Sequence, residues 1–286
     1  MYVIIGLIVV IVAVLLGYIM GHGNVILLIQ PAEYITIIGA ALGSLVVASS
    51  PSMLKKIVAG IVGAIKSNHV HKHYYLEILK SFNDLFLEAQ RDGLLSIESH
   101  IEKPEESKIL NRNAKFIGDK FVTDFFCDSM KILLTGSVPP HELENLIDTE
   151  IESYELEYKP VAGAVSKVGD AFPGLGIVAA VMGIIITMSK VDEGAAAVGM
   201  HVAAALVGTF LGVLMSYGIV GPIASKMEHD IENRVRYLHT IKAAIVAYAK
   251  GNPPIIAVEI ARRTIFSDER PSFAELEGHM RNKTGA

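Results

Sequence analysis

The sequence predicts an all-α integral membrane protein with four transmembrane helices, a large helical cytoplasmic loop between spans two and three, and a helical cytoplasmic tail. Of its 286 residues, 51% are hydrophobic and only 19% are charged, which is below the roughly 25% of an ordinary soluble domain. The apolar residues gather in two blocks, separated by mixed polarity over residues 54–170. This composition argues against a soluble enzyme, and it excludes a disordered chain because there is ample apolar surface to bury.

The first apolar block contains two predicted spans. A bilayer core requires about 20 apolar residues in a helix, and residues 1–20 supply that length without a charge. A cleavable signal peptide is the alternative, but the apolar run is too long and lacks both a basic start and a small-residue cleavage site. The second span covers residues 34–50, and we expect it to extend back through Ala32 and forward into Met53.

The second apolar block contains spans three and four, at residues 172–189 and 200–223. No Asp, Glu, Lys, Arg or His lies within residues 172–189 or 202–223, and the polar side chains there are Thr187, Ser189, Thr209, Ser216 and Tyr217. Ion paths normally need a titratable group inside the membrane. Either the chain transports nothing, or a partner brings the acid and these hydroxyls line its path. For Thr209 alone, a hydrogen bond to its own helix is the simpler interpretation.

Positive residues predict the orientation. The segments 22–33 and 190–199 contain between them only one basic residue, Lys190. Basic residues instead begin the long loop and the tail, at Lys55, Lys56, Lys66, Lys226, Arg234 and Arg236. Since basic residues favour the cytoplasmic side, the loop, the tail and the N-terminus are expected inside.

The chain therefore divides into four predicted parts. These are spans one and two (residues 1–53), a cytoplasmic helical loop domain (54–170), spans three and four (171–223) and cytoplasmic C-terminal helices (224–286). Small-xxx-small pairs, Gly39 with Gly43 and Gly208 with Gly212, favour close helix packing in lipid. They could pack within one bundle or against other subunits, and we expect an oligomer.

Several cytoplasmic helices are predicted. Residues 54–66 are amphipathic and could lie along the inner interface or continue span two. An apolar stripe predicts a helix over 74–92, capped by Gly93, and Ser96 is typical of the N-cap of the next helix. Residues 226–250 are expected to continue span four, and 255–266 to form a last helix.

Two prolines flank spans three and four. With Asp170 as N-cap, Pro173 falls in the first turn of span three, where its missing N–H costs little. Pro222 follows Gly221 near the end of span four. Either the two prolines simply mark helix ends, or they form a pair of hinges at the cytoplasmic ends of spans three and four.

Charged residues in the loop admit two interpretations. Arg91 in the last turn of one helix and Glu98 in the first turn of the next both suit the helix dipoles. Alternatively, both point outward as a docking surface for a charged protein. The acidic stretch of residues 142–152, which includes Glu150, is most simply a solvated helix face.

Other chemistry is not expected. His69 and His73 are four residues apart and could share a metal, but no acidic or cysteine ligand lies nearby in sequence, so we expect no metal and no cofactor. The lone cysteine, Cys127, has apolar neighbours typical of a core thiol. The net charge of −5 argues against nucleic acid, and no NTPase, serine hydrolase or zincin motif is present.

Five long blocks carry a resemblance. They are GLLSIESHIEKPEES (93–107), GDAFPGLGIVAAVMGII (169–185), VGTFLGVLMSYGIVGPIA (207–224), PPIIAVEIARRT (253–264) and SDERPSFAELE (267–277). Over nearly its whole length the chain resembles the MotA/PomA family of flagellar motor stator subunits, which is related to the TolQ/ExbB energisers. The last block is similar to the longer-tailed, proton-driven branch.

The resemblance implies a function. Family members form a homopentamer around a MotB dimer in the bacterial inner membrane, and the single membrane helix of MotB brings the essential aspartate. The transported ion is then expected to be H⁺, and its flux drives torque on the rotor switch protein FliG through the cytoplasmic loop.

The resemblance also implies roles for residues. The two functional prolines correspond to Pro173 and Pro222, and the channel threonine corresponds to Thr209. Thr187 and Tyr217, taken from the other hydroxyls of the spans, complete the expected ion pathway. The loop acid that engages the rotor corresponds to Glu98, and we add Arg91 and Glu150 to the expected rotor-facing set. The family's basic residue corresponds to Gln90, so whether Arg91 replaces it stays open.

Two rival functions remain. An energiser of TonB or Tol partners would have three spans and an outside N-terminus. A membrane scaffold would conduct nothing.

Overall fold

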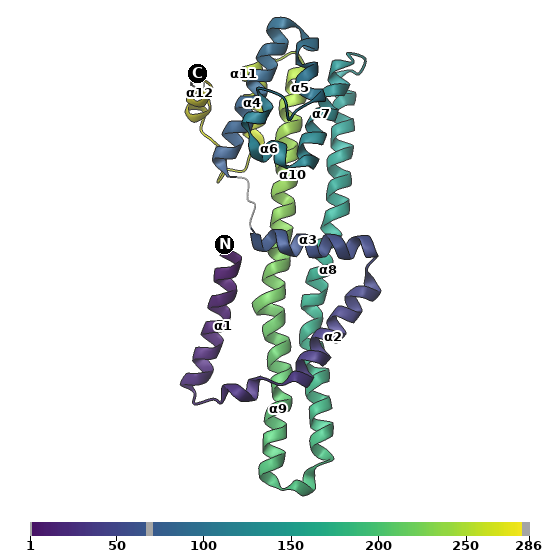
Figure 1. Cartoon of the computed structure of the whole chain (residues 1–286), viewed down its shortest axis with the longest axis vertical. Helices are drawn as coiled ribbons and strands as arrows, with labels where there is room; N and C mark the ends of the chain where they lie inside the picture. The colour runs from purple at the N-terminus through teal and green to yellow at the C-terminus, as the bar shows by residue number, and fades with distance from the viewer. Residues whose placement is uncertain (1, 67–70, 282–286) are drawn as a thin grey trace. The chain divides into compact units, whose positions relative to one another are not determined.

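The structure is a computed structural model that describes residues 2–66 and 71–281. Within these ranges all secondary-structure elements are helices, and there is no β-strand (Figure 1). Four helical stretches are long and apolar enough to cross a membrane: Tyr2–Met20, Val25–Ala48, Pro140–Met188 and Ala195–Ala249. The four predicted apolar stretches are therefore present as helices. The chain forms two compact units, an apolar unit (residues 1–68 and 157–231) and a polar unit (69–156 and 232–286).

The first half of the apolar unit consists of α1 (Tyr2–Met20), the 3₁₀ turn η1 (Val25–Leu28), α2 (Pro31–Ala48) and α3 (Pro51–Lys66). Pro31 occupies the first turn of α2, where its missing N–H is not needed. The helix ends at Ser49, which is extended with φ −128° and ψ 141°. Our expectation that span two continues into Met53 is therefore wrong, because Pro51 starts a new helix.

The amphipathic helix α3 lies across α8 and α10 (Figure 1). Its buried residues Ile57 and Ala64 pack with Val161 and Met227. Of the two arrangements left open by the sequence, a separate helix is the one observed.

The second half of the apolar unit is a helical hairpin of α8 (Pro140–Met188) and α9 (Ala195–Val213) (Figure 1). A π-helical segment (Leu214–Val220) joins α9 to α10 (Gly221–Ala249). This continuous helix confirms that the segment 226–250 extends the fourth span. Both α8 and α10 contribute residues to each unit.

One helix boundary was predicted wrongly. The sequence suggested that Asp170 caps a helix starting near Phe172, but α8 is continuous over 49 residues and contains Pro160 and Pro173 in its interior. A proline in a helix removes one hydrogen bond. A long helix packed against neighbours tolerates that loss, so the Asp and Pro signals did not mark a helix start.

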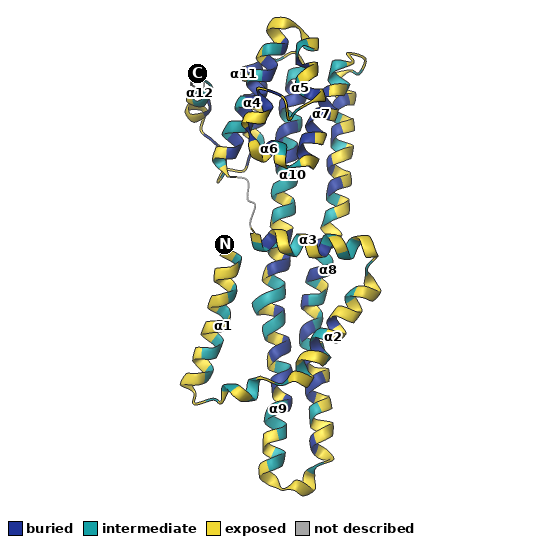
Figure 2. Cartoon of the chain, viewed as in Figure 1, coloured by how far each residue is buried: buried dark blue, intermediate teal, exposed yellow. Residues whose placement is uncertain are grey.

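The polar unit surrounds an aromatic core. Its own helices are α4 (Lys72–Asp92), α5 (Glu98–Glu102), α6 (Ala114–Gly118), α7 (Lys120–Leu134), α11 (Pro254–Thr264) and α12 (Phe273–Arg281), with short 3₁₀ turns η2 (Leu94–Ile97) and η3 (Leu110–Arg112). The rings of Phe82 and Phe126 stack with centroids 4.5 Å apart. The buried side chains gather along α4, α7 and the facing part of α10 (Figure 2).

Two buried tyrosines of this core share a hydrogen bond. The Tyr237 hydroxyl donates a hydrogen bond to the Tyr74 hydroxyl at 3.1 Å, and burial raises the pKa of Tyr74 to about 12. Burial also raises the pKa of the Cys127 thiol to about 12. Cys127 is 4% exposed, which confirms the predicted core thiol.

Candidate functional site

Helices α8 and α9 approach at glycines. A Cβ built on Gly176 would lie 2.7 Å from the carbonyl oxygen of Gly208, and one built on Gly212 would lie 2.5 Å from the carbonyl oxygen of Phe172. Only a residue without a side chain allows backbones this close. The pair Gly208 and Gly212 therefore packs inside the chain.

The other glycine pair is open. Gly39 and Gly43 of α2 have no described heavy atom within 4 Å of a built Cβ. Every described residue of α1 is also at least partly exposed (Figure 2). Apolar, small-residue faces that the chain leaves uncovered are suited to contact with lipid or with other membrane helices.

The predicted pathway hydroxyls differ in their surroundings. Thr187 is fully buried and its Oγ1 donates a hydrogen bond to the Gly183 carbonyl at 2.8 Å. Thr209 is half-buried, and its Cα lies 3.3 Å from a Cβ built on Gly176. Tyr217 is 73% exposed. The two threonines thus belong to the packed α8–α9 pair, whereas Tyr217 lies on the outside of the chain.

Pro222 lies at a change of helix type. It is the second residue of α10, and α10 begins at Gly221, directly after the π segment Leu214–Val220. The Gly221 N–H donates to the Ser216 carbonyl, and a Cβ on Gly221 would lie 2.8 Å from that oxygen. Such π segments interrupt α-helical hydrogen bonding and occur frequently at functional sites. The sequence contained no signal for this segment beyond the Gly-Pro pair.

An acid that the sequence analysis overlooked lies in the apolar unit. Glu33, in the first turn of α2, points at the α8–α9 pair: a Cβ on Gly208 would lie 2.6 Å from its Oε2, and one on Gly183 would lie 3.6 Å from its Oε1. The Oε2 atom is buried and has no hydrogen-bond partner within the described part of the chain. Glu33 lies outside spans three and four, the two segments whose lack of acids pointed to a partner's carboxyl. The signal was a single Glu beside Ala32, inside the expected extension of span two.

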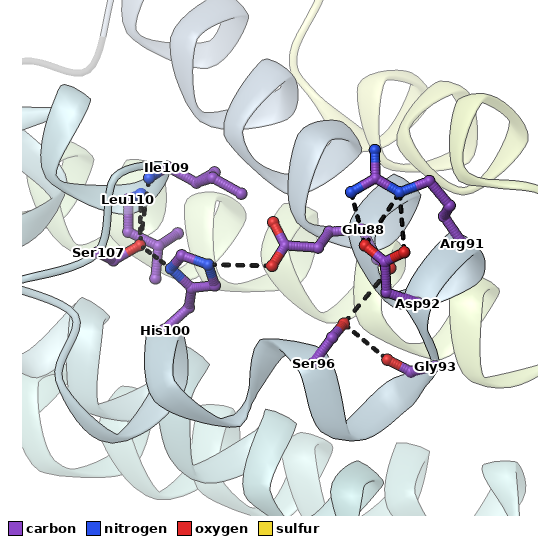
Figure 3. Close-up of polar contacts among 9 residues, drawn as sticks. All are labelled: Glu88, Arg91, Asp92, Gly93, Ser96, His100, Ser107, Ile109 and Leu110. Carbon is purple, nitrogen blue, oxygen red and sulfur yellow. Dashed lines mark hydrogen bonds and ion pairs between the residues drawn. The ribbon is translucent and has the colours of Figure 1, made fainter.

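The rotor-facing residues of the prediction lie in the polar unit. Gly93, with φ 93°, ends α4 and confirms the predicted cap. Arg91 is exposed, and its guanidinium donates to both carboxylate oxygens of Asp92 at 2.6–3.0 Å (Figure 3). These hydrogen bonds lower the pKa of Asp92. Glu98 is exposed at the start of α5.

The predicted N-cap at Ser96 is wrong. The Ser96 hydroxyl donates to the Gly93 carbonyl at 2.7 Å (Figure 3). Helix α5 begins at Glu98, with Ile97 in the cap position. The chain forms a 3₁₀ turn over 94–97 instead. Ser96 therefore lies inside this turn, and Ile97 rather than Ser96 directly precedes α5.

His100 of α5 contacts Glu88 of α4. His100 Nε2 lies 3.3 Å from Glu88 Oε1, and its Nδ1 lies 2.7 Å from Ser107 Oγ (Figure 3). Ser107 Oγ also accepts from the backbone N–H groups of Ile109 and Leu110. Glu88, His100 and Ser107 lie along a groove of about 1150 Å³ whose lining includes Arg91. The sequence analysis did not identify this network, since its members are spread over 20 residues.

Glu150 is exposed on α8. The acidic stretch around it is not entirely solvated, because Asp148 accepts from Lys242 at 2.8 Å and Glu144 accepts from Lys250 at 2.8 Å. Within residues 2–66 and 71–281, no group of three or more possible metal ligands is found. His69, which we considered as one half of a metal pair, lies outside the described residues.

Two family models match the chain. Residues 4–93 match the motility protein A N-terminal model, and residues 118–240 match the MotA/TolQ/ExbB proton channel family. Motility protein A of Salmonella typhimurium is 35% identical over 281 residues, covering 98% of this chain and 95% of that protein. Chemotaxis protein LafT of Vibrio parahaemolyticus is 34% identical, covering 98% of each chain.

Solved structures show the same fold. A chain of the C. jejuni MotAB structure matches with a TM-score of 0.79 and 21% identity, covering 95% of this chain and 98% of that one. A chain of the flagellar MotAB stator complex from Bacillus subtilis matches with a TM-score of 0.72 and 21% identity, covering 92% and 94%.

Proposed function

The chain belongs to the motility protein A family, within the wider MotA/TolQ/ExbB proton channel family, and we infer that it is a stator subunit of the bacterial flagellar motor. This membership confirms the resemblance found in the sequence. The family consists of ion channels and stators rather than enzymes. We propose that the chain conducts ions together with MotB and converts the flux into torque.

The observation that carries this proposal is the packed α8–α9 pair. Residues 172–189 and 202–213 of this pair contain hydroxyls but no Asp, Glu, Lys, Arg or His, and its backbones meet at glycines. Such a surface is suited to one wall of an ion path, with the acid on a partner helix. MotB, which accompanies MotA in the matched MotAB structures, is the partner that the family implies.

The energy available is adequate. Neutralising a carboxylate at low dielectric removes a penalty of several kcal/mol. One charge crossing about 100 mV gains about 2.3 kcal/mol, which is comparable to a typical allosteric coupling energy. Proton binding to the MotB aspartate can therefore bias a two-state step of the subunits.

The open faces of α1 and α2 support an oligomer. We propose a homopentamer around a MotB dimer, in the bacterial inner membrane, with both termini and the large loop in the cytoplasm. The parts defined above, residues 1–53, 54–170, 171–223 and 224–286, then serve as outer spans, rotor-facing domain, channel wall and tail. The boundary at 170/171 falls inside α8, so one helix would connect the channel wall to the rotor-facing domain.

We propose that Pro173 and Pro222 act as hinges, and that Thr209, Thr187 and Tyr217 line the ion path. Glu98, Arg91 and Glu150 would contact the rotor switch protein FliG. Because Arg91 is bound to Asp92, it would have to leave that carboxylate before contacting an acid of the rotor.

Co-expression with an Asp-bearing single-span partner tests the proposal. The complex should pass protons, and the flux should vanish when that aspartate becomes Asn. Liposomes containing only this chain should be electrically silent. Current through the chain alone, or an unchanged flux with the Asn variant, would contradict the proposal.

One further measurement separates the energiser rival, and another identifies the coupling ion. A cytoplasmic Met1 would exclude the three-span energiser arrangement, whereas an outside Met1 would support it. Swimming speed that persists as sodium is removed would support proton coupling.

A further inference from the structure

We propose that Glu33 is a second proton-binding carboxyl of the ion path, carried by this chain itself and seated on the small-residue surface of α8 and α9. The inference rests on the proposed channel function and extends it. The chain would then supply an acid of its own as well as a wall for the partner's acid.

The Glu33 carboxyl lies beside two glycines, Gly208 of α9 and Gly183 of α8. A side chain on Gly208 would bring its Cβ within 2.6 Å of Glu33 Oε2, and one on Gly183 would bring it within 3.6 Å of Oε1. The other groups beside a Gly208 Cβ are the Ala179 methyl and the Ala180 backbone N, at 3.1 Å and 3.2 Å. The carboxyl thus fits where two helices both omit a side chain.

One oxygen of this carboxyl lacks a partner. Glu33 Oε2 is buried without a hydrogen bond to any described residue. An ionised carboxylate in such a place needs a donor or a cation, whereas the protonated acid does not. The first turn of α2, however, favours a negative charge through the helix dipole. These opposing influences make both protonation states accessible, which a proton carrier requires.

The position is also next to the predicted path. Gly183 accepts the hydrogen bond of the Thr187 hydroxyl, and Gly208 precedes Thr209 in α9. The Glu33 carboxyl therefore lies beside Gly183, which accepts from Thr187, and beside Gly208, the residue before Thr209. We infer that its carboxylate takes a proton from water, becomes a neutral acid, and releases the proton to the next acceptor, ending as the original carboxylate.

A carbodiimide, which reacts with protonated carboxyls in apolar surroundings, tests this in the intact complex with the single-span partner. Mass spectrometry should find Glu33 modified, with labelling that increases as the pH falls and does not respond to sodium. Absence of labelling at Glu33 would overturn the proposal. Protection by sodium would overturn the proton assignment in favour of a cation site.

Flux supplies a second readout. Glu33→Gln should lower proton flux through the complex by about tenfold or more, as expected when a positioned proton-transfer group is lost. Asp192→Asn changes an exposed acid of the α8–α9 turn and is the matched control, with unchanged flux. Normal flux in Glu33→Gln would overturn the proposal.

The outcomes are separable from those of the proposed function. If the wild-type complex passes no protons, the proposed function fails, while the labelling still decides the chemistry of Glu33. If the Glu33→Gln complex does not assemble, the Glu33→Asp complex is tested instead, because this variant retains the carboxyl. The labelling and the proton flux of the Glu33→Asp complex then decide.

Discussion

Gly176 of α8 packs directly against Gly208 of α9, so closely that a Cβ on Gly176 would lie 2.7 Å from the Gly208 carbonyl oxygen and 3.1 Å from the Gly212 Cα. The obstacles are backbone atoms, which cannot move aside as a flexible side chain can. The separation of the two helices is therefore determined by the absence of side chains at these positions.

Gly176→Ala should force α8 and α9 apart. Overpacking of this kind costs about 1–3 kcal/mol, so we expect less assembled complex in the membrane and a loss of motility. Gly174→Ala is the control, because nothing lies within 4 Å of its built Cβ. Equal behaviour of the two variants in thermal unfolding of the purified complex would contradict the close packing.

Pro173→Ala should leave assembly intact but stop rotation. Alanine restores the backbone donor that proline lacks and stiffens α8 at this point. Pro160→Ala changes the other proline inside the same helix and should retain swimming. Tethered-cell rotation measures both. Normal swimming with Pro173→Ala would exclude a hinge at this residue.

Glu98→Lys should reduce torque without blocking ion flux, because the side chain is exposed in the polar unit. Glu105→Lys makes the same charge change at a nearby exposed position and should have a smaller effect. Bead assays report torque, and the intracellular pH response reports flux. A blocked flux in Glu98→Lys would assign this residue to the ion path.

Phe82→Ala should destabilise the polar unit by about 3–5 kcal/mol, since it removes a fully buried ring and leaves a cavity. The ring stacks on Phe126 at 4.5 Å. Leu95→Ala alters a side chain that is 71% exposed and should change little. Protease resistance of the full-length protein compares them. Similar resistance in both variants would contradict the aromatic core.

The contacts of Glu259 predict an acid-sensitive α11. Hydrogen bonds from Arg262, followed by Arg263, lower the pKa of Glu259 from its ordinary value of 4.5. A lowered pKa stabilises the folded state above the ordinary value and loses that contribution as the pH falls through the folded-state pKa. The protection factors of the α11 amides, which are corrected for the intrinsic pH dependence of amide exchange, should therefore decrease below about pH 4.5.

Glu259→Gln should remove most of that pH dependence, and the α11 amides of this variant should exchange faster than those of the wild type at neutral pH. Glu269 is not suited as a control because it accepts from the Lys72 backbone. Asp268→Asn, at a neighbouring exposed acid, is suitable. An unchanged pH profile in Glu259→Gln would assign the acid sensitivity to other carboxyls.

The sequence by itself determined the features that depend on length and local pattern. The 20-residue uncharged run of residues 1–20 has few alternatives to a membrane helix, and the structure has α1 there. The apolar stripe of α4 followed by Gly93 defined that helix and its end. Long matching blocks in the right order likewise identified the family. These signals are local, so they survive without knowledge of the neighbours.

Tertiary structure decided the features that depend on what each segment packs against. Asp170 and Pro173 have the local signature of a helix start, yet α8 continues through them. Glu33 is a single acid in sequence, and only the glycines of two other helices show where its carboxyl lies. Gly39 with Gly43 and Gly208 with Gly212 share one motif, but the first pair is open and the second is packed. The physical reason is that spacing along a chain specifies which residues share a face, while the partner of that face is chosen by long-range packing.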